Sequence, residues 1–141
     1  MLLDLTNLTY AISALDKSIN SYKVLSQNTN LTQDDMDTIK SGVIQNFEVA
    51  YEQCWKFIQR WIRENRTPED ADHPLTRKEL FRLAATYGLI KDPLPWFGYG
   101  EKRNLTSHTY DGTTAEGVFQ AALCFLSDSQ FLAKKLEDSN D

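Results

Sequence analysis

Apolar residues recur every three or four positions in three stretches of the chain, and this spacing limits the possible folds more than any other feature of the sequence. Alternating steps of three and four keep side chains on one face of an α-helix. The three stripes are Leu5, Leu8, Ile12, Leu15, Ile19 and Tyr22; Val43, Phe47, Ala50, Cys54, Phe57 and Trp61; and Val118, Ala122, Phe125, Ser129, Leu132 and Leu136. No stretch shows the strict alternation of a half-buried strand. We therefore predict an all-α protein, an antiparallel up-and-down bundle of four or five helices.

The middle stripe belongs to the longest predicted helix, from about Asp34 to Asn65, and this helix carries a second apolar stripe. Its members are Ile44, Tyr51, Trp55, Ile58 and Ile62. One bundle core needs only one stripe, so the second indicates either a helix buried on two sides or a face that a partner subunit covers. We favour the partner subunit and predict a homodimer formed through this helix and the helix that contains Arg103.

Turn and capping signals delimit the shorter elements. Residues 68–74 are predicted to form a loop, in which His73 is solvated. Thr76–Glu79 matches a capping box that opens a short helix, and Gly88 follows the end of that helix. Asp111-Gly112 interrupts the chain, and residues 113–116 are predicted to cap the final helix.

A fourth helix is predicted to begin at Asp92-Pro93, with the aspartate as N-cap and the proline in the first turn, and to run through Arg103. It contains Gly98 and Gly100. Each glycine weakens a helix by about 1 kcal/mol relative to alanine. We therefore expect this helix to pack closely against another backbone.

The length of the chain, 141 residues of which 41% are hydrophobic, supplies one core and not two. We predict a single domain over residues 1–141, ordered from about 3 to 137. The net charge of −5 argues against a protein that binds nucleic acid over a broad basic face. The sequence has neither an apolar run of transmembrane length nor a basic signal-peptide start, so we expect a cytoplasmic protein without a membrane partner.

The cysteines and the acidic residues do not indicate a metal site. Cys54 and Cys124 lack metal-ligand spacing and are too few for a disulfide scaffold, so we expect two buried thiols. Asp34, Asp35 and Asp37 fall in the first turn of a helix, where carboxylates complement the helix dipole. We predict no metal and no cofactor.

One segment, residues 103–110, concentrates polar groups that could act chemically. It contains Arg103, Asn104, His108 and Tyr110. On a continuous helix Asn104 and His108 share a face, whereas Arg103 and His108 are about 140° apart and do not point at one phosphate. Either the helix ends near Ser107 and redirects His108, or a second subunit supplies the partner group.

Two interpretations of these residues remain open. Histidine titrates near neutral pH, so it can take the proton from a ribose 2′-hydroxyl, and an arginine can hold the charge of the phosphorane in metal-free RNA cleavage. Alternatively, Arg103, Asn104 and His108 form a buried polar cluster that satisfies carbonyls at helix ends.

The arrangement of Arg103, four intervening residues, His108 and then Tyr110 resembles the Arg-x4–6-His motif of the HEPN superfamily in its RxxxxHxY form, strengthened by Asn104 directly after the arginine. The chain also resembles one branch of that superfamily, the nucleotidyltransferase substrate-binding or HepT-like proteins. That resemblance rests on Asn46-Phe47-Glu48, on Trp96 and on residues 115–119, and it extends from about Leu5 to Leu136.

The resemblance implies a four- or five-helix bundle that dimerises, with the motif facing a cleft at the interface. It implies a ribonuclease toxin with Arg103, Asn104 and His108 as catalytic residues. It also implies a partner, a minimal nucleotidyltransferase that acts as antitoxin by transferring AMP from ATP to Tyr110. The older name of the branch implies an alternative, a non-catalytic subunit that binds the substrate of its nucleotidyltransferase partner.

Overall fold

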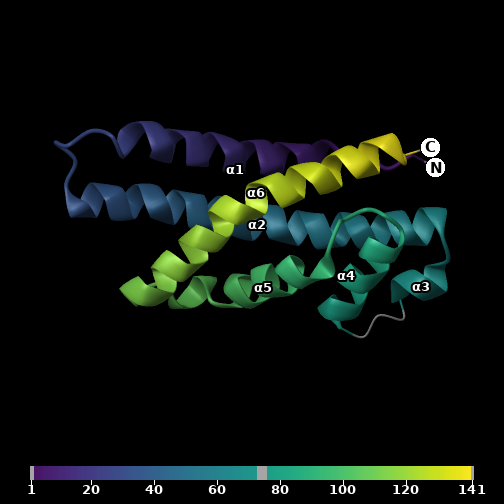
Figure 1. Cartoon of the computed structure of the whole chain (residues 1–141). Coiled ribbons are helices and arrows are strands. Elements are labelled where there is room, and N and C mark those ends of the chain that lie inside the picture. The colour runs from purple at the N-terminus through teal and green to yellow at the C-terminus, as the bar shows by residue number, and fades with distance from the viewer. Residues whose placement is uncertain (1, 73–75, 141) are drawn as a thin grey trace.

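Helix α2, Gln33–Asn65, forms the central axis of the protein (Figure 1). In the computed structural model, which describes residues 2–72 and 76–140, α2 contacts every other helical element described. The remaining elements are α1 (Thr6–Leu25), α3 (Pro68–Asp72), α4 (Arg77–Thr86), α5 (Pro93–Asn104), the short 3₁₀ helix η1 (Thr106–His108) and α6 (Gly112–Asp138). Within the described ranges all regular structure is helical. The predicted all-α bundle is confirmed.

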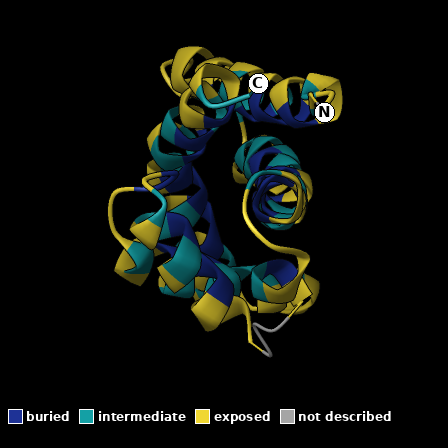
Figure 2. Cartoon of the chain, turned by 90° about the vertical axis from the view of Figure 1, so that its right-hand side faces the viewer, coloured by how far each residue is buried: buried dark blue, intermediate teal, exposed yellow. Residues whose placement is uncertain are grey.

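The three predicted stripes form the core of the bundle. Every member of the α2 and α6 stripes is buried, and in α1 only the first and last members, Leu5 and Tyr22, are partly exposed. Figure 2 shows the buried residues on the inward faces of the helices and the exposed residues on the outward faces. The helical spacing in the sequence therefore locates most of the core.

Helices α1 and α2 lie side by side in opposite directions, and α6 crosses them obliquely (Figure 1). The two ends of the chain meet at one end of the bundle. There the Asn140 side chain accepts a hydrogen bond from the backbone N–H of Leu3 and donates one to the Leu3 carbonyl, both at 2.9 Å. These bonds attach the end of α6 beside the start of α1.

An aromatic cluster centred on Phe125 of α6 fixes α5 against α2. The Phe125 ring lies 5.2 Å from the ring of Phe47, 5.3 Å from Trp96 and 5.0 Å from Tyr99, in each case nearly edge to face. Such pairs each contribute about 0.5–1.5 kcal/mol beyond the apolar area that they bury. The cluster therefore sets the position of α5, which ends in Arg103 and Asn104.

The predicted helix starts agree with the structure in part. Thr76 caps α4 by accepting from Glu79 N at 3.2 Å, and Asp92 caps α5 by accepting from Leu94 N at 3.0 Å. Gly88, with a φ of +78°, adopts the left-handed conformation expected after a helix end. Asp35 completes a capping box with Thr32, so its carboxylate stabilises the start of α2 as predicted for the acidic first turn.

Two local predictions are wrong. Residues 68–72 form the one-turn helix α3 rather than a loop, because Thr67 accepts from Asp70 N and the apolar Ala71 is buried against α2. The predicted position of His73 lies outside the described residues. Helix α6 begins at Gly112, because its cap is Asp111 rather than residues 113–116; the Asp111 carboxylate accepts from Thr113 N at 3.0 Å.

The second apolar stripe of α2 is mostly buried within the chain itself. Ile44, Tyr51, Ile58 and Ile62 are 7% exposed or less, and Trp55 is partly covered by Arg77, whose guanidinium lies 3.7 Å from the indole ring centroid. Helix α2 is therefore buried on two sides within the chain. This is the alternative that we did not favour from the sequence. The homodimer stays a prediction, without support from this stripe.

The glycines of α5 and the cysteines also differ from expectation. A Cβ on Gly100 would lie 2.8 Å from the Tyr51 hydroxyl oxygen, whereas a Cβ on Gly98 meets nothing within 4 Å. Helix α5 therefore approaches its neighbour closely at Gly100 alone of these two glycines, and what it approaches is the Tyr51 side chain rather than a backbone. Cys54 is fully buried, which raises the pKa of its thiol, but Cys124 is exposed.

None of the described helices has the length and hydropathy needed to span a bilayer.

Candidate functional site

Arg103, in the last turn of α5, is attached to two carboxylates of α2. Its Nε donates to Glu52 Oε1 at 3.0 Å, and its Nη1 lies 3.6 Å from Glu48 Oε2 and 3.4 Å from the Thr106 hydroxyl. The Arg103 side chain is 31% exposed. Within the described chain, no hydrogen bond involves Nη2, so this end of the guanidinium keeps donors for a further anion.

Both carboxylates are oriented by a second group as well. Trp55 Nε1 donates to Glu52 Oε2 at 2.8 Å, and the Thr106 hydroxyl is hydrogen-bonded to Glu48. Glu48 and Glu52 are four residues apart and therefore share one face of α2. The position of the arginine is thus set by a helix that lies far from it in the sequence.

The helix that carries Arg103 ends at Asn104, three residues before Ser107, near which one of the two alternatives left open by the sequence placed its end. The chain continues through η1, whose tighter turn shows in the hydrogen bond from His108 N to Leu105 O at 2.9 Å. The Thr106 hydroxyl lies within hydrogen-bond distance of Arg103 O, at 2.9 Å, and of the Glu48 carboxylate. These contacts favour the end of α5 at Asn104. Arg103 and His108 are therefore not on one continuous helix.

The other motif side chains are exposed. In the part of the chain that the structure describes, neither Asn104 nor His108 makes a side-chain hydrogen bond. The ring centroids of His108 and Tyr110 lie 6.3 Å apart at an interplanar angle of 73°. Tyr110 is 88% exposed. In the described structure, Asn104 and His108 therefore do not form the polar cluster on helix-end carbonyls that was the second interpretation of the sequence.

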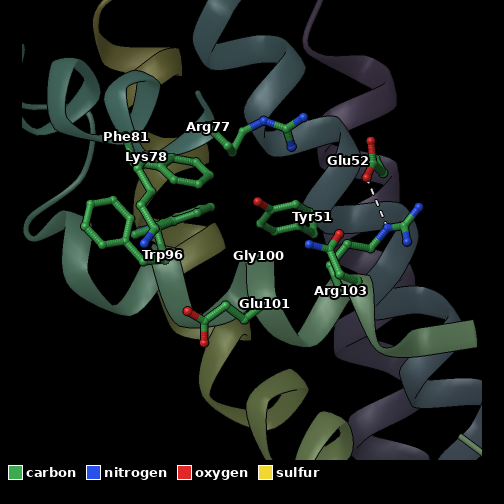
Figure 3. A pocket seen from close by; sticks show the side chains of 11 residues that line it. Tyr51, Glu52, Arg77, Lys78, Phe81, Trp96, Gly100, Glu101 and Arg103 are labelled. Atoms are coloured by element: carbon green, nitrogen blue, oxygen red, sulfur yellow. Dashed lines mark hydrogen bonds and ion pairs between the residues drawn. The ribbon is translucent and has the colours of Figure 1, made fainter. Parts of the chain in front are cut away.

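The motif borders two cavities. One, of about 300 Å³, lies between α2, α4 and α5 and is lined by Arg103 and Asn104 among others (Figure 3). The other, of about 430 Å³, lies between the first parts of α2 and α6 and is lined by Thr109 and Tyr110. The cavity that Tyr110 borders is therefore not the one that Arg103 borders.

Comparison with known proteins assigns the family. Residues 3–138 match the model of the family described as nucleotidyltransferase substrate binding protein like. The chain belongs to this family. It is 36% identical, over 74% of its length and 71% of the relative's, to a Haemophilus influenzae protein named probable ribonuclease HepT.

Solved structures share this fold, and one of them agrees with the family assignment. A Haemophilus influenzae structure, described as showing the fold of a substrate binding domain of a nucleotidyltransferase, superposes with a TM-score of 0.87 at 30% identity and covers 95% of this chain and 99% of its own. A Thermus thermophilus structure superposes with a TM-score of 0.64 at 24% identity, over 86% of this chain and 98% of its own, and shows the shared fold.

The sequence analysis did not identify the residues that surround Arg103 in the folded chain. Glu48, Glu52 and Thr106 hold Arg103, and Arg77 borders the same cavity. Glu48 and Glu52 are four residues apart on the predicted helix and so share one face. That spacing indicates a site only once Arg103 is known to lie opposite them. Within residues 2–72 and 76–140, no group of three or more His, Cys, Asp and Glu side chains is placed to hold a metal ion.

Proposed function

We propose that this chain is an endoribonuclease of the HepT type that needs no metal ion. The observation that carries the proposal is the state of the motif: His108 is exposed and free of side-chain hydrogen bonds to the described residues, while Arg103 is fixed on α2 with Nη2 still available. An unbonded imidazole can exchange protons with a substrate, and the free Nη2 of a fixed guanidinium can donate charge-assisted hydrogen bonds to a phosphate. The relative named probable ribonuclease HepT supports the same activity.

The reaction needs a base, a group that holds phosphate and a proton for the leaving group. His108 takes the proton of the ribose 2′-hydroxyl, and the 2′-oxygen forms a bond to the adjacent phosphorus. The bond from phosphorus to the 5′-oxygen breaks, which leaves a 2′,3′-cyclic phosphate, and the 5′-oxygen takes a proton from solvent or from a second imidazolium. Arg103 and the Asn104 amide hold the non-bridging oxygens as charge develops on them.

The carboxylates of α2 compete with the substrate phosphate for Arg103. Partly exposed ion pairs contribute little, about 1 kcal/mol or less, so a phosphate can share the guanidinium without a large cost. Glu48 and Glu52 then act as positioning residues, because they aim the guanidinium while its Nη2 binds the substrate.

We also propose a homodimer in which each site combines groups of two subunits. The helix break separates Arg103 from His108, and one chain presents them on different elements, α5 and η1. A second copy related by a twofold axis would place its own η1 beside the first chain's α5.

The proposed partner is a minimal nucleotidyltransferase that acts as antitoxin. The family description and the structural relative both refer to a nucleotidyltransferase. Tyr110 is accessible, at 88% exposure, and its ring lies 6.3 Å from that of His108. AMP transferred to the Tyr110 hydroxyl would place a negatively charged phosphate and a nucleoside beside the histidine and exclude RNA.

A second candidate function is a non-catalytic subunit that binds the substrate of the nucleotidyltransferase. The observation that favours it is the pairing of Arg103 with Glu48 and Glu52, which reduces the positive charge at the site. The structural relative is itself described as a substrate binding domain. This function requires the same partner but no cleavage of RNA.

Expression in cells separates the two functions. The chain expressed alone should arrest growth, and His108→Ala should relieve the arrest. Co-expression with the nucleotidyltransferase should restore growth and add the mass of AMP to the chain, and Tyr110→Phe should abolish the addition. Normal growth with the chain alone would favour the substrate-binding function, and AMP addition that persists in Tyr110→Phe would refute the role of Tyr110.

A further inference from the structure

The two hydrogen-bonding edges of the Arg103 guanidinium share one nitrogen. Nε and Nη2 lie along one edge, and Nη1 and Nη2 lie along the other. Nε donates to Glu52 Oε1 at 3.0 Å, and Nη1 lies 3.6 Å from Glu48 Oε2. Arginine and a carboxylate frequently pair by two parallel hydrogen bonds along one edge, so either glutamate could also take Nη2. Among the described residues, Nη2 donates to neither.

Trp55 occupies the oxygen of Glu52 that a second bond to Arg103 would need. Its Nε1 donates to Glu52 Oε2 at 2.8 Å, while Glu52 Oε1 accepts from Arg103 along the dashed line in Figure 3. The other carboxylate at this cavity, that of Glu101, is directed away from Arg103 (Figure 3). Each oxygen of Glu52 therefore serves a different donor, and the carboxylate does not place both along the Nε–Nη2 edge.

Helix α4 restrains the Trp55 ring from which this N–H reaches Glu52. The Arg77 guanidinium lies 3.7 Å from the indole ring centroid, and Lys56 Nζ lies 5.7 Å from it. A planar guanidinium stacks on an aromatic face and so limits the rotation of the ring. Trp55 is partly buried, at the edge of the core. The contact with Arg77 therefore restrains a ring that core packing does not enclose completely.

We propose that Trp55 is a positioning residue that keeps Nη2 of Arg103 free for a substrate phosphate. By holding Glu52 Oε2, the indole N–H prevents the glutamate from closing a two-point pair on the Nε–Nη2 edge. Arg77 acts one step further away, because it restrains the indole. The inference rests on the proposed function only in naming an RNA phosphate as the group that Nη2 binds.

Arginine side-chain NMR of the full chain tests this geometry without any substrate. The Arg103 signals are identified by their loss in Arg103→Lys. Trp55→Phe keeps a ring beneath Arg77 but removes the N–H, so Glu52 Oε2 should turn to Nη2. Exchange of the Nη2 hydrogens with solvent should then slow by about two- to fivefold, the protection expected from one partly exposed ion-pair contact.

Trp61→Phe is the matched control for that measurement. It removes an indole N–H from the same helix, but this N–H donates to Ser139 O at 3.3 Å and has no contact with Glu52 in the described structure. Exchange at Nη2 of Arg103 should stay unchanged in Trp61→Phe. An equal slowing in both variants would show a general effect of losing an indole and would overturn the inference.

RNA binding tests the consequence for the substrate. A 2′-O-methyl oligoribonucleotide cannot be cleaved through its 2′-oxygen, so its Kd reports binding alone. Trp55→Phe should raise this Kd by about two- to fivefold, and should raise KM for cleavable RNA by the same factor with little change in kcat. In a Glu52→Gln background it should have no further effect, because the competing charge is absent. A loss of binding that is equal in both backgrounds would reduce Trp55 to a packing role and overturn the inference.

Arg77→Met covers the case in which Trp55→Phe does not fold. It removes the stacked guanidinium and leaves the indole N–H, so exchange at Nη2 of Arg103 should slow by a smaller factor in the same direction. Lys78→Met is its control, because it removes a charge at the same cavity from a residue that lies over Phe97 instead of Trp55. Unchanged exchange in every folded variant of Trp55 and Arg77 would overturn the inference.

The outcomes separate the positioning role from the ribonuclease function. If Trp55→Phe slows exchange at Nη2 but RNA is neither bound nor cleaved, the positioning of Arg103 stands and the ribonuclease function fails. If RNA is cleaved while Trp55→Phe changes neither that exchange nor KM, the ribonuclease function stands and the positioning role fails. Slower exchange with an unchanged Kd for bound RNA would refute phosphate binding by Nη2.

Discussion

The two ends of the motif differ in how firmly the fold holds them. Arg103 is tied to α2 through Glu52 and Glu48, and α5 beneath it is packed on the aromatic cluster around Phe125. His108 and Tyr110 lie beyond the helix break and are exposed, and their rings contact each other. The fold thus fixes the arginine for which we propose phosphate binding, and it leaves the end for which we propose proton transfer and modification accessible to a substrate, a second subunit or a partner enzyme.

The largest expected difference between the two ends is in catalysis. Arg103→Ala should lower kcat/KM for RNA cleavage by about 10²–10³, because it removes a preorganised donor to the phosphorane. Tyr110→Phe should change kcat/KM by no more than about twofold, because in the proposed function the hydroxyl accepts AMP and takes no part in cleavage. Initial rates on one RNA substrate measure both. If Tyr110→Phe lowered kcat/KM as much as Arg103→Ala does, the proposed difference between the two ends of the motif would be wrong.

Mixing two inactive variants tests whether the ends act across subunits. If each site combines Arg103 of one chain with His108 of the other, an equilibrated mixture of Arg103→Ala and His108→Ala should recover about a quarter of the normal activity, because half of the dimers are mixed and each of those has one intact site. Each variant alone is the control. If the mixture stays as inactive as its components, both residues act within one chain.

A smaller effect is expected from the carboxylate that holds Arg103. Glu52→Gln keeps an acceptor for Nε but removes the charge that competes with phosphate, so KM for RNA should fall by about two- to fivefold with little change in kcat. Gln53→Glu is a matched control, since it alters charge on the same helix at a residue with no contact to Arg103 in the described structure. A large fall in kcat for Glu52→Gln would instead make its charge essential.

The smallest effect concerns the fixed position of α5 over Tyr51. Gly98→Ala should raise the free energy of unfolding by about 1 kcal/mol, because alanine favours helix and the new Cβ meets nothing. Gly100→Ala should lack this gain or reverse it, since its Cβ would collide with the Tyr51 hydroxyl. Urea unfolding of both variants measures the difference. Equal gains would show that α5 is free to move away from α2.

The fold was predictable from the sequence because it depends on local spacing. The stripes through Leu15, Phe47 and Phe125 specify helices and their buried faces without knowledge of any partner. The same spacing left the second stripe of α2 ambiguous, because it does not tell which element covers it. Tyr51 and Ile58 turned out to be buried by the chain itself.

The site was predictable only where it is local. Arg103, Asn104, His108 and Tyr110 lie within eight residues and form a recognisable pattern. The partners of Arg103 are not local: Glu52 is 51 residues away, and the Thr106–Glu48 contact that accompanies the helix break spans 58 residues. Such contacts follow from how α5 packs on α2, which residue spacing within either helix does not reveal.

The most direct test of the proposed mechanism is cleavage of RNA by the purified chain in the presence of EDTA. We predict that cleavage persists without metal ions and that His108→Ala reduces it by about 10²–10⁴, the usual loss for an acid–base group. Cleavage that disappears with EDTA but survives in His108→Ala would contradict a metal-free mechanism based on this histidine.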